Sequence, residues 1–194
     1  KMVRLLHDRA KAAPKRLVFA EADQMDVLKA AQIVHEEGIA IPILLGNKAT
    51  IDDLRAAINF DDEVEIIDPK EEAHKAQRDH YADLFWKDQR RKGYTLYDAQ
   101  RLMRERNYYA SMMIKNRDAD AMISGYSRNY RSVVKPILET ISKAKGVSRV
   151  AATNLMLTKS GPLFLSDTTI NVDPTAKELA KIAQMTANTS KLFG

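Results

Sequence analysis

The stretch Arg16-Leu17-Val18-Phe19-Ala20 decides the fold class, because it is a short apolar run between charged residues. Such a run is typical of a strand buried on both faces of a sheet. The segment Val3 to Ala12 precedes it with amphipathic spacing and predicts a helix, which Pro14 ends. A helix therefore leads into the first strand of the fold.

Strand and helix patterns alternate along the residues that follow. Apolar runs predict strands at residues 41–45, 64–67 and 120–124. Periodic spacing and caps predict helices at residues 26–37, 50–57, 71–91, 95–104, 107–116 and 130–144, with a capping box from Thr95 to Asp98. Alternation of this kind predicts a largely parallel sheet with helices on its faces.

The C-terminal part predicts a second sheet. Residues 147–157 and 163–167 have strand patterns, and the turn between them is short enough to require antiparallel pairing. A capping box from Thr175 to Glu178 opens a helix through about Asn188. We expect a three-layer α/β/α fold with a first α/β domain at residues 1–145 and a second, with a mixed sheet, beginning at residues 146–194.

Composition limits the class of protein. The chain is 45% hydrophobic and 29% charged and has no cysteine, which favours a globular protein of a reducing compartment. No run of about 18 apolar residues is present, and the start from Lys1 to Asp8 is too short and charged for a signal peptide. We expect a cytoplasmic protein without membrane association.

The positive charge is local. Most of the formal charge of +5 comes from residues 86–106, a segment that suits an anionic partner or forms a solvated helical face. Trp86 and Tyr94 flank its basic cluster and could stack on an adenine ring, or Trp86 could be buried. A nucleic-acid-binding module is an alternative that no recognition-helix or RNA-platform motif supports.

The stock motifs for cofactors and metals are absent. The glycines form no dinucleotide-binding, P-loop or nucleophile-elbow pattern. The closest histidine pair, His74 and His80, is six residues apart, or about 240° around a helix, and cannot chelate from one face. We assign no catalytic residue and no metal ligand in this chain.

The loop from Gly125 to Asn129 is the best candidate site. It joins the end of a predicted parallel strand to a helix, a place where free N–H groups point at an anion. Ser127, Arg128 and Asn129 lie in it, with Lys135 nearby. An ordinary loop with solvated basic residues fits the pattern equally well. Further along, Asp167 and Asn171 follow a strand and either orient a ligand or satisfy loop amides.

Several segments resemble the phosphate acetyl/butyryl transferase family in order and spacing. They are residues 118–125, 136–138, 146–150 and 171–176. Within that family, residues 106–109, 128–130 and 165–172 look most like the C-terminal phosphotransacetylase-like domain of bacterial hybrid NADP-dependent malic enzymes. The resemblance implies a fold related to isocitrate dehydrogenase, with acetyl-CoA in a cleft between domains. It also implies a fragment whose first domain lacks its C-terminal return.

The resemblance further implies a regulatory, oligomerising segment that senses acetyl-CoA or a related acyl-CoA or phosphate ligand. It would form homo-oligomers beside a malic enzyme catalytic domain in the same chain. That parent would decarboxylate malate to pyruvate with NADP and a divalent Mg or Mn, and the segment itself would hold no cofactor. The expected phosphate contacts are Arg128, Lys135 and Arg91, and the expected pocket residues are Ser127, Asn129, Asp167 and Asn171.

Two departures from the family pattern argue against transacetylase activity. Active members usually carry Arg before the proline that corresponds to Pro136, and this chain has Lys135, which cannot fork onto phosphate. A second family Arg falls on Gln89, or on Arg90 after a shift of one residue. An active phosphate acetyltransferase, making acetyl phosphate from acetyl-CoA and phosphate, remains the alternative.

Overall fold

The computed structural model describes residues 2–147, 149–167 and 169–193. The chain divides into two compact units, one of Arg9–Ser142 and one of Lys1–Asp8 with Lys143–Gly194. The helix α1 (Met2–Ala12) belongs to both. The predicted domains at 1–145 and 146–194 stay a prediction.

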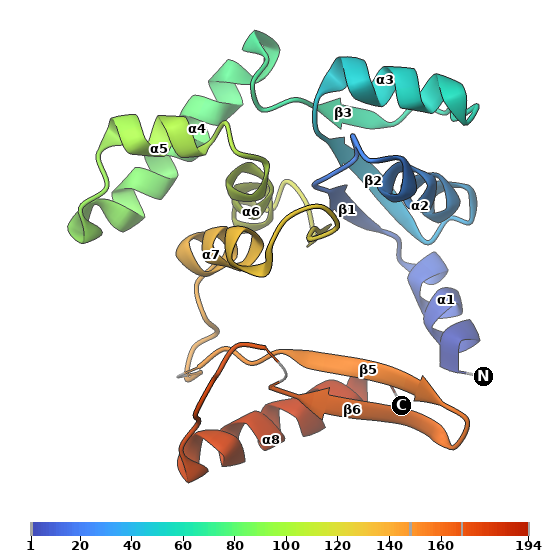
Figure 1. Cartoon of the computed structure of the whole chain (residues 1–194), viewed down its shortest axis with the longest axis vertical. Coiled ribbons are helices and arrows are strands. Elements are labelled where there is room, and N and C mark those ends of the chain that lie inside the picture. Colours follow the sequence, from blue (N-terminus) through green and yellow to red (C-terminus); the bar gives the residue numbers. More distant parts are fainter. Residues whose placement is uncertain (1, 148, 168, 194) are drawn as a thin grey trace. The chain divides into compact units, whose positions relative to one another are not determined.

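The larger unit contains the parallel sheet that the sequence predicts. Its order is β3-β2-β1-β4, and all three pairings are parallel. The strand β1 pairs with both β2 and β4, and Figure 1 shows it beside β2 and β3. The strands are β1 (Lys15–Phe19), β2 (Ala40–Leu45), β3 (Glu65–Ile67) and β4 (Ala121–Ile123).

Helices cover both faces of this sheet and make three layers. Phe19 and Leu44 pack in one buried cluster with residues of α2 and α3. Val18 and Ile43 point to the other face, since side chains alternate along a strand, and pack with residues of α4, α5 and α6. The helices of this unit are α2 (Met25–Glu36), α3 (Lys48–Ala57), α4 (Lys75–Gln89), α5 (Leu96–Leu102), α6 (Arg106–Asn116) and α7 (Tyr130–Thr140).

Three predicted helix boundaries in this unit are wrong. The single helix expected at 71–91 is α4 with a short 3₁₀ turn at each end, η1 (Glu72–His74) and η2 (Arg90–Lys92). The helix expected to reach residue 144 ends at Thr140, because Ile141 is extended. Asn107 does not cap α6: Glu105 does, its carboxylate accepting from the N–H of Asn107. Asn107 is instead buried inside the first turn.

The smaller unit holds an antiparallel hairpin and one long helix. The hairpin joins β5 (Thr153–Thr158) to β6 (Gly161–Ser166), and the helix is α8 (Ala176–Leu192). The antiparallel pairing and the capping box of Thr175 and Glu178 are confirmed. Among the described residues the sheet has only this pair, so its mixed character stays a prediction.

The predicted strand at 147–157 begins too early. Residues 149–152 are not strand, and β5 starts at Thr153. Two positions of the predicted segments, Ser148 and Thr168, lie outside the described residues. The Thr95 to Asp98 capping box of the larger unit is confirmed, with the Asp98 N–H donating to Thr95 Oγ1 at 3.1 Å.

Candidate anion-binding site at the carboxyl edge of the sheet

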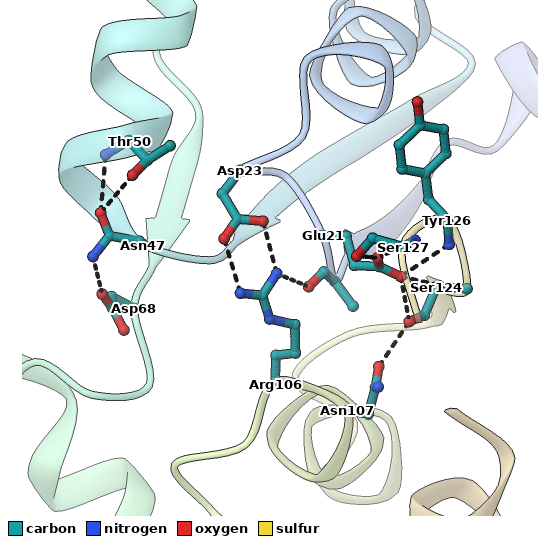
Figure 2. Close-up of polar contacts among 12 residues, drawn as sticks. Glu21, Asp23, Asn47, Thr50, Asp68, Arg106, Asn107, Ser124, Tyr126 and Ser127 are labelled. Carbon is teal, nitrogen blue, oxygen red and sulfur yellow. Dashed lines mark hydrogen bonds and ion pairs between the residues drawn. The ribbon is translucent and has the colours of Figure 1, made fainter. Parts of the chain in front are cut away.

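The carboxyl ends of the four parallel strands meet at one edge of the sheet, and a polar segment follows each of them (Figure 2). Ligands of open α/β sheets bind outside this edge, at the point where the strand order reverses. That point lies between β1 and β4 here, since β2 and β4 flank β1 on opposite sides. The residues that follow the strands are Glu21, Asp23, Asn47, Asp68, Lys70 and the loop 124–127.

The loop after β4 binds an anion, and that anion is the carboxylate of Glu21. Oε1 of Glu21 accepts from the N–H groups of Gly125 at 2.6 Å and Tyr126 at 3.0 Å. Oε2 accepts from the N–H of Ser127 at 2.7 Å and from its hydroxyl at 2.5 Å. Ser124 adds a fifth hydrogen bond from its hydroxyl at 3.1 Å. We call Glu21 with Gly125, Tyr126 and Ser127 the filled loop.

Backbone geometry and electrostatics both suit this arrangement. Gly125 has φ of 106°, in the left-handed region that glycine adopts without strain, and the next N–H groups converge on one point. Burial would raise the pKa of Glu21, whose side chain is 1% exposed. Hydrogen bonds from Ser127 and from the loop N–H groups outweigh burial and lower that pKa to about 2. Glu21 is therefore ionised at any physiological pH.

A second carboxylate, the partly buried Asp23, holds α6 to the end of β1. Asp23 receives two parallel bonds from Arg106, at 2.7 and 2.8 Å, in the forked geometry that favours an arginine–carboxylate pair. Burial raises the pKa of Asp23, but the Arg106 guanidinium lowers it by more. Because this pair is closed, the charge of Arg106 is neutralised within the fold.

Beside these closed contacts lies an open cavity of about 250 Å³. Asn47 forms part of its wall, capping α3 through the N–H of Thr50 at 3.0 Å and donating to Asp68 at 3.4 Å. We call this cavity the edge pocket, and its lining residues are Gly46, Asn47, Asp68, Pro69, Lys70, Arg104, Glu105, Arg106 and Arg128.

Three cations of the edge pocket have no partner among the residues that the structure describes. The side chains of Lys70, Arg104 and Arg128 make no hydrogen bond or ion pair with any residue that the structure describes. The fourth cation, Arg106, is paired with Asp23. A pocket with unpaired cations and several walls favours an anion of phosphate size.

The sequence predicted one of these cations. Arg128 lines the edge pocket, while the neighbouring Ser127 is bonded to Glu21. Asn129 caps α7 by accepting from the N–H of Ser132 at 3.0 Å. The three predicted loop residues thus have three different roles in this structure.

The other predicted residues lie elsewhere. Lys135 is half exposed on α7 and its ammonium is 3.8 Å from Glu139. Arg91 is exposed in η2. Asp167 and Asn171 are in the smaller unit, where Asn171 Nδ2 donates to Asp167 at 2.8 Å and to the Val150 carbonyl at 3.0 Å. These bonds use only Oδ1 of Asp167, whose Oδ2 is buried without a hydrogen-bond partner among the described residues. A ligand role for Asp167 and Asn171 stays a prediction.

Sequence reasoning missed Glu21, Asp23, Lys70 and Arg104. Glu21 and Asp23 follow the first predicted strand directly, so the sequence indicates that both lie at the carboxyl edge of the sheet. Arg104 gave no such signal, because it follows α5 and reaches the edge only through packing of helices on the sheet.

No group of three His, Asp or Glu side chains among the described residues is arranged to hold a metal ion. No described helix combines the length and apolar character needed to cross a membrane.

The family model described as phosphate acetyl/butaryl transferase matches residues 1–194. The chain belongs to this family. A phosphate acetyltransferase of Nitratidesulfovibrio vulgaris is 31% identical over 190 residues, which are 97% of this chain and 27% of that protein. An NADP-dependent malic enzyme of Rhizobium meliloti is 29% identical over 191 residues, 96% of this chain and 25% of that enzyme.

Solved structures agree with this membership. A phosphotransacetylase from Streptococcus pyogenes superposes with a TM-score of 0.88 and 31% identity, covering 99% of this chain and 58% of that one. The three-layer fold is therefore that of a phosphotransacetylase. The chain spans about a quarter of the two sequence relatives and little more than half of the structural one.

Proposed function

We propose that this phosphotransacetylase-family chain senses acetyl-CoA as the regulatory and oligomerising part of a malic enzyme. The observation that carries the ligand class is the edge pocket with its three unpaired cations, Lys70, Arg104 and Arg128. Phosphate groups of an acyl-CoA or acyl phosphate are the anions that such a pocket fits. NADP and a divalent metal would bind in the separate catalytic part of that enzyme.

Side chains, rather than loop amides, would hold the phosphate. The N–H groups of Gly125, Tyr126 and Ser127 are all within 3.0 Å of the Glu21 carboxylate. A phosphate would have to displace an ionised, buried carboxylate to reach them, and two anions cannot share the loop. Asp68 and Glu105 also line the edge pocket, but neither is paired with Arg128 in the part of the chain that the structure describes.

The surroundings of Lys135 and Gln89 support sensing rather than transacetylation. Lys135 stands where active members of the family usually carry Arg, and Gln89 is one of the two positions, with Arg90, on which the second family Arg falls. Both Lys135 and Gln89 contact Glu139. Gln89 Nε2 donates to the Glu139 backbone carbonyl at 2.6 Å, and the Lys135 ammonium lies 3.8 Å from the Glu139 carboxylate. Tyr108 and Tyr94 donate to that carboxylate at 2.5 and 3.0 Å. A carboxylate fixed beside Lys135 weakens its attraction for phosphate.

The malic enzyme relative supports the parent that we propose. The names of the other relatives favour a second function, since several similar proteins are phosphate acetyltransferases. In that reaction a base removes the thiol proton of CoA. The thiolate then attacks the carbonyl carbon of acetyl phosphate, and inorganic phosphate leaves with the bonding electrons.

The test measures three quantities on the full-length protein: acetyl-CoA binding by calorimetry, NADPH production from malate, and acetyl-CoA formation from acetyl phosphate and CoA. We expect acetyl-CoA to bind and to change the rate of NADPH production, with no measurable transacetylation. Brisk acetyl-CoA formation without NADPH production from malate would show that the second function is the correct one.

A further inference from the structure

A second basic cavity lies against α4 and α5. Its volume is about 370 Å³, and we call it the helix pocket. It is lined by Lys75, Arg78, Asp79, Tyr97, Gln100, Arg101 and Arg104. Four of these side chains are cationic and one is a carboxylate. Arg104 also lines the edge pocket, so the two cavities are neighbours.

Arg78 is a buried cation without a counter-ion. It is 5% exposed, and Nη1 donates to the carbonyls of Pro69 at 2.9 Å and Glu71 at 3.0 Å. No carboxylate of the described residues forms an ion pair with it. A buried charge is normally paired, because its desolvation is otherwise uncompensated. The two carbonyls fix the plane of the guanidinium, as a site that receives an anion requires.

Arg104 is a second cation of the helix pocket without a partner among the described residues. The remaining two cations, Lys75 and Arg101, are in weak ion pairs. The ammonium of Lys75 lies 3.5 Å from Glu72, and Arg101 lies 3.9 Å from Asp98, with all these side chains but Asp98 well exposed. Such exposed pairs are weak and exchange readily for a phosphate. The pocket therefore has the charge for more than one phosphate group.

Tyr97 gives the helix pocket an aromatic surface. Its residue is 73% exposed on the first turn of α5, and its ring contacts no other aromatic or cationic side chain among the described residues. An exposed ring beside cations is the arrangement on which a nucleobase stacks. A single exposed tyrosine is common on protein surfaces. Tyr97 indicates a base-binding site because it lines the same cavity as four cations.

We propose that the helix pocket binds a nucleotide with two or more phosphates, its base on Tyr97 and its phosphates on Arg78, Arg101 and Arg104. Two sources share this chemistry. One is a free nucleoside diphosphate, and the other is the nucleotide end of a CoA thioester. In the second case the inference rests on the proposed function, with Arg104 as the contact common to both cavities.

The test titrates ADP and inorganic pyrophosphate into the full-length protein and its variants by calorimetry. We expect Tyr97→Ala to weaken ADP binding at least about fivefold, the loss of one stacked base, and to leave pyrophosphate binding unchanged. Tyr97→Phe retains the ring and should bind ADP like the wild type. Arg101→Ala should weaken both ligands, while Lys29→Ala, an exposed cation on α2, should affect neither.

Competition identifies the source of the ligand. Displacement of ADP by acetyl-CoA would assign the pocket to the CoA thioester, and simultaneous binding would assign it to a free nucleotide. Equal ADP affinity of wild type and Tyr97→Ala, or no ADP binding at millimolar concentration, would overturn the proposal. Acetyl phosphate has no base and tests the edge pocket through Arg128→Ala, so the proposed function can stand when this inference fails.

Discussion

The filled loop and the edge pocket lie on the same edge of one sheet and treat negative charge in opposite ways. In the filled loop, three N–H groups and a hydroxyl are all bonded to Glu21. In the edge pocket, Lys70, Arg104 and Arg128 have no partner among the described residues. The donors of the filled loop are bonded to a carboxylate of the same chain, whereas the cations of the edge pocket are open to a ligand.

This difference shows that an anion-binding loop does not by itself mark a ligand site. A loop after a parallel strand can fold around a carboxylate of its own chain and then serves to fix the backbone. Arg128 follows Ser127 directly, so the filled loop also fixes the position of Arg128 in the wall of the edge pocket. Glu21 is in this sense a positioning residue for Arg128.

The largest expected effect is on the filled loop. Glu21→Ala removes the buried carboxylate that accepts from three loop N–H groups and a hydroxyl, and we expect the free energy of unfolding to fall by about 3 kcal/mol. Urea unfolding monitored by circular dichroism measures it. Glu63→Ala, an exposed glutamate, is the matched control and should change stability by less than about 0.5 kcal/mol.

Rescue by a small carboxylate separates this explanation from general destabilisation. Formate should raise the melting temperature of Glu21→Ala, because it fills the vacated loop and binds only the folded state. Formate should not raise the melting temperature of the wild type or of Glu21→Gln, because in both proteins a side chain still occupies the loop. Equal response of all three proteins to formate would contradict the account of the filled loop.

The next largest effect concerns the partly buried pair of Asp23 and Arg106. Asp23→Asn keeps the shape of the side chain but loses the charge that Nη1 and Nη2 of Arg106 contact. We expect a loss of about 2 kcal/mol in the free energy of unfolding. If Asp23→Asn is as stable as the wild type, the closed contacts of this edge do not anchor α6.

The pH dependence of stability tests the charge of Glu21. Its pKa falls from 4.5 to about 2 on folding, so its ionised form stabilises the fold fully above pH 4.5. That contribution is lost as the pH falls toward 2. The stability difference between wild type and Glu21→Gln should therefore shrink over this range, as urea unfolding at several pH values would show. A difference that stays constant would mean that Glu21 is not ionised in the fold.

The smallest effect is expected for Lys135. It is half exposed and 3.8 Å from Glu139, so Lys135→Ala should change the free energy of unfolding by less than about 0.5 kcal/mol. Its effect on acetyl-CoA affinity should be smaller than that of Arg128→Ala. An equal or larger loss of affinity would move the phosphate from the edge pocket to α7.

The sheet and its layers could be predicted from the sequence, because apolar runs such as residues 16–20 and helical spacing are local signals. The filled loop could be predicted only in part. Its position after a parallel strand indicates a place for an anion, but nothing in the sequence indicates that Glu21, more than a hundred residues away, supplies that anion. Arg128 was predicted from its neighbours in the chain. Lys70 and Arg104 could not be predicted, since only tertiary packing brings them into the same pocket as Arg128.

The most direct test of the central claim is calorimetric titration of acetyl-CoA into the full-length protein and its Arg128→Ala and Lys29→Ala variants. The account predicts a loss of affinity of about tenfold or more for Arg128→Ala, the size of one charge-assisted contact. Lys29→Ala should bind like the wild type, and the melting temperatures of all three should agree. Unchanged affinity of Arg128→Ala would contradict the claim that the edge pocket holds the phosphate.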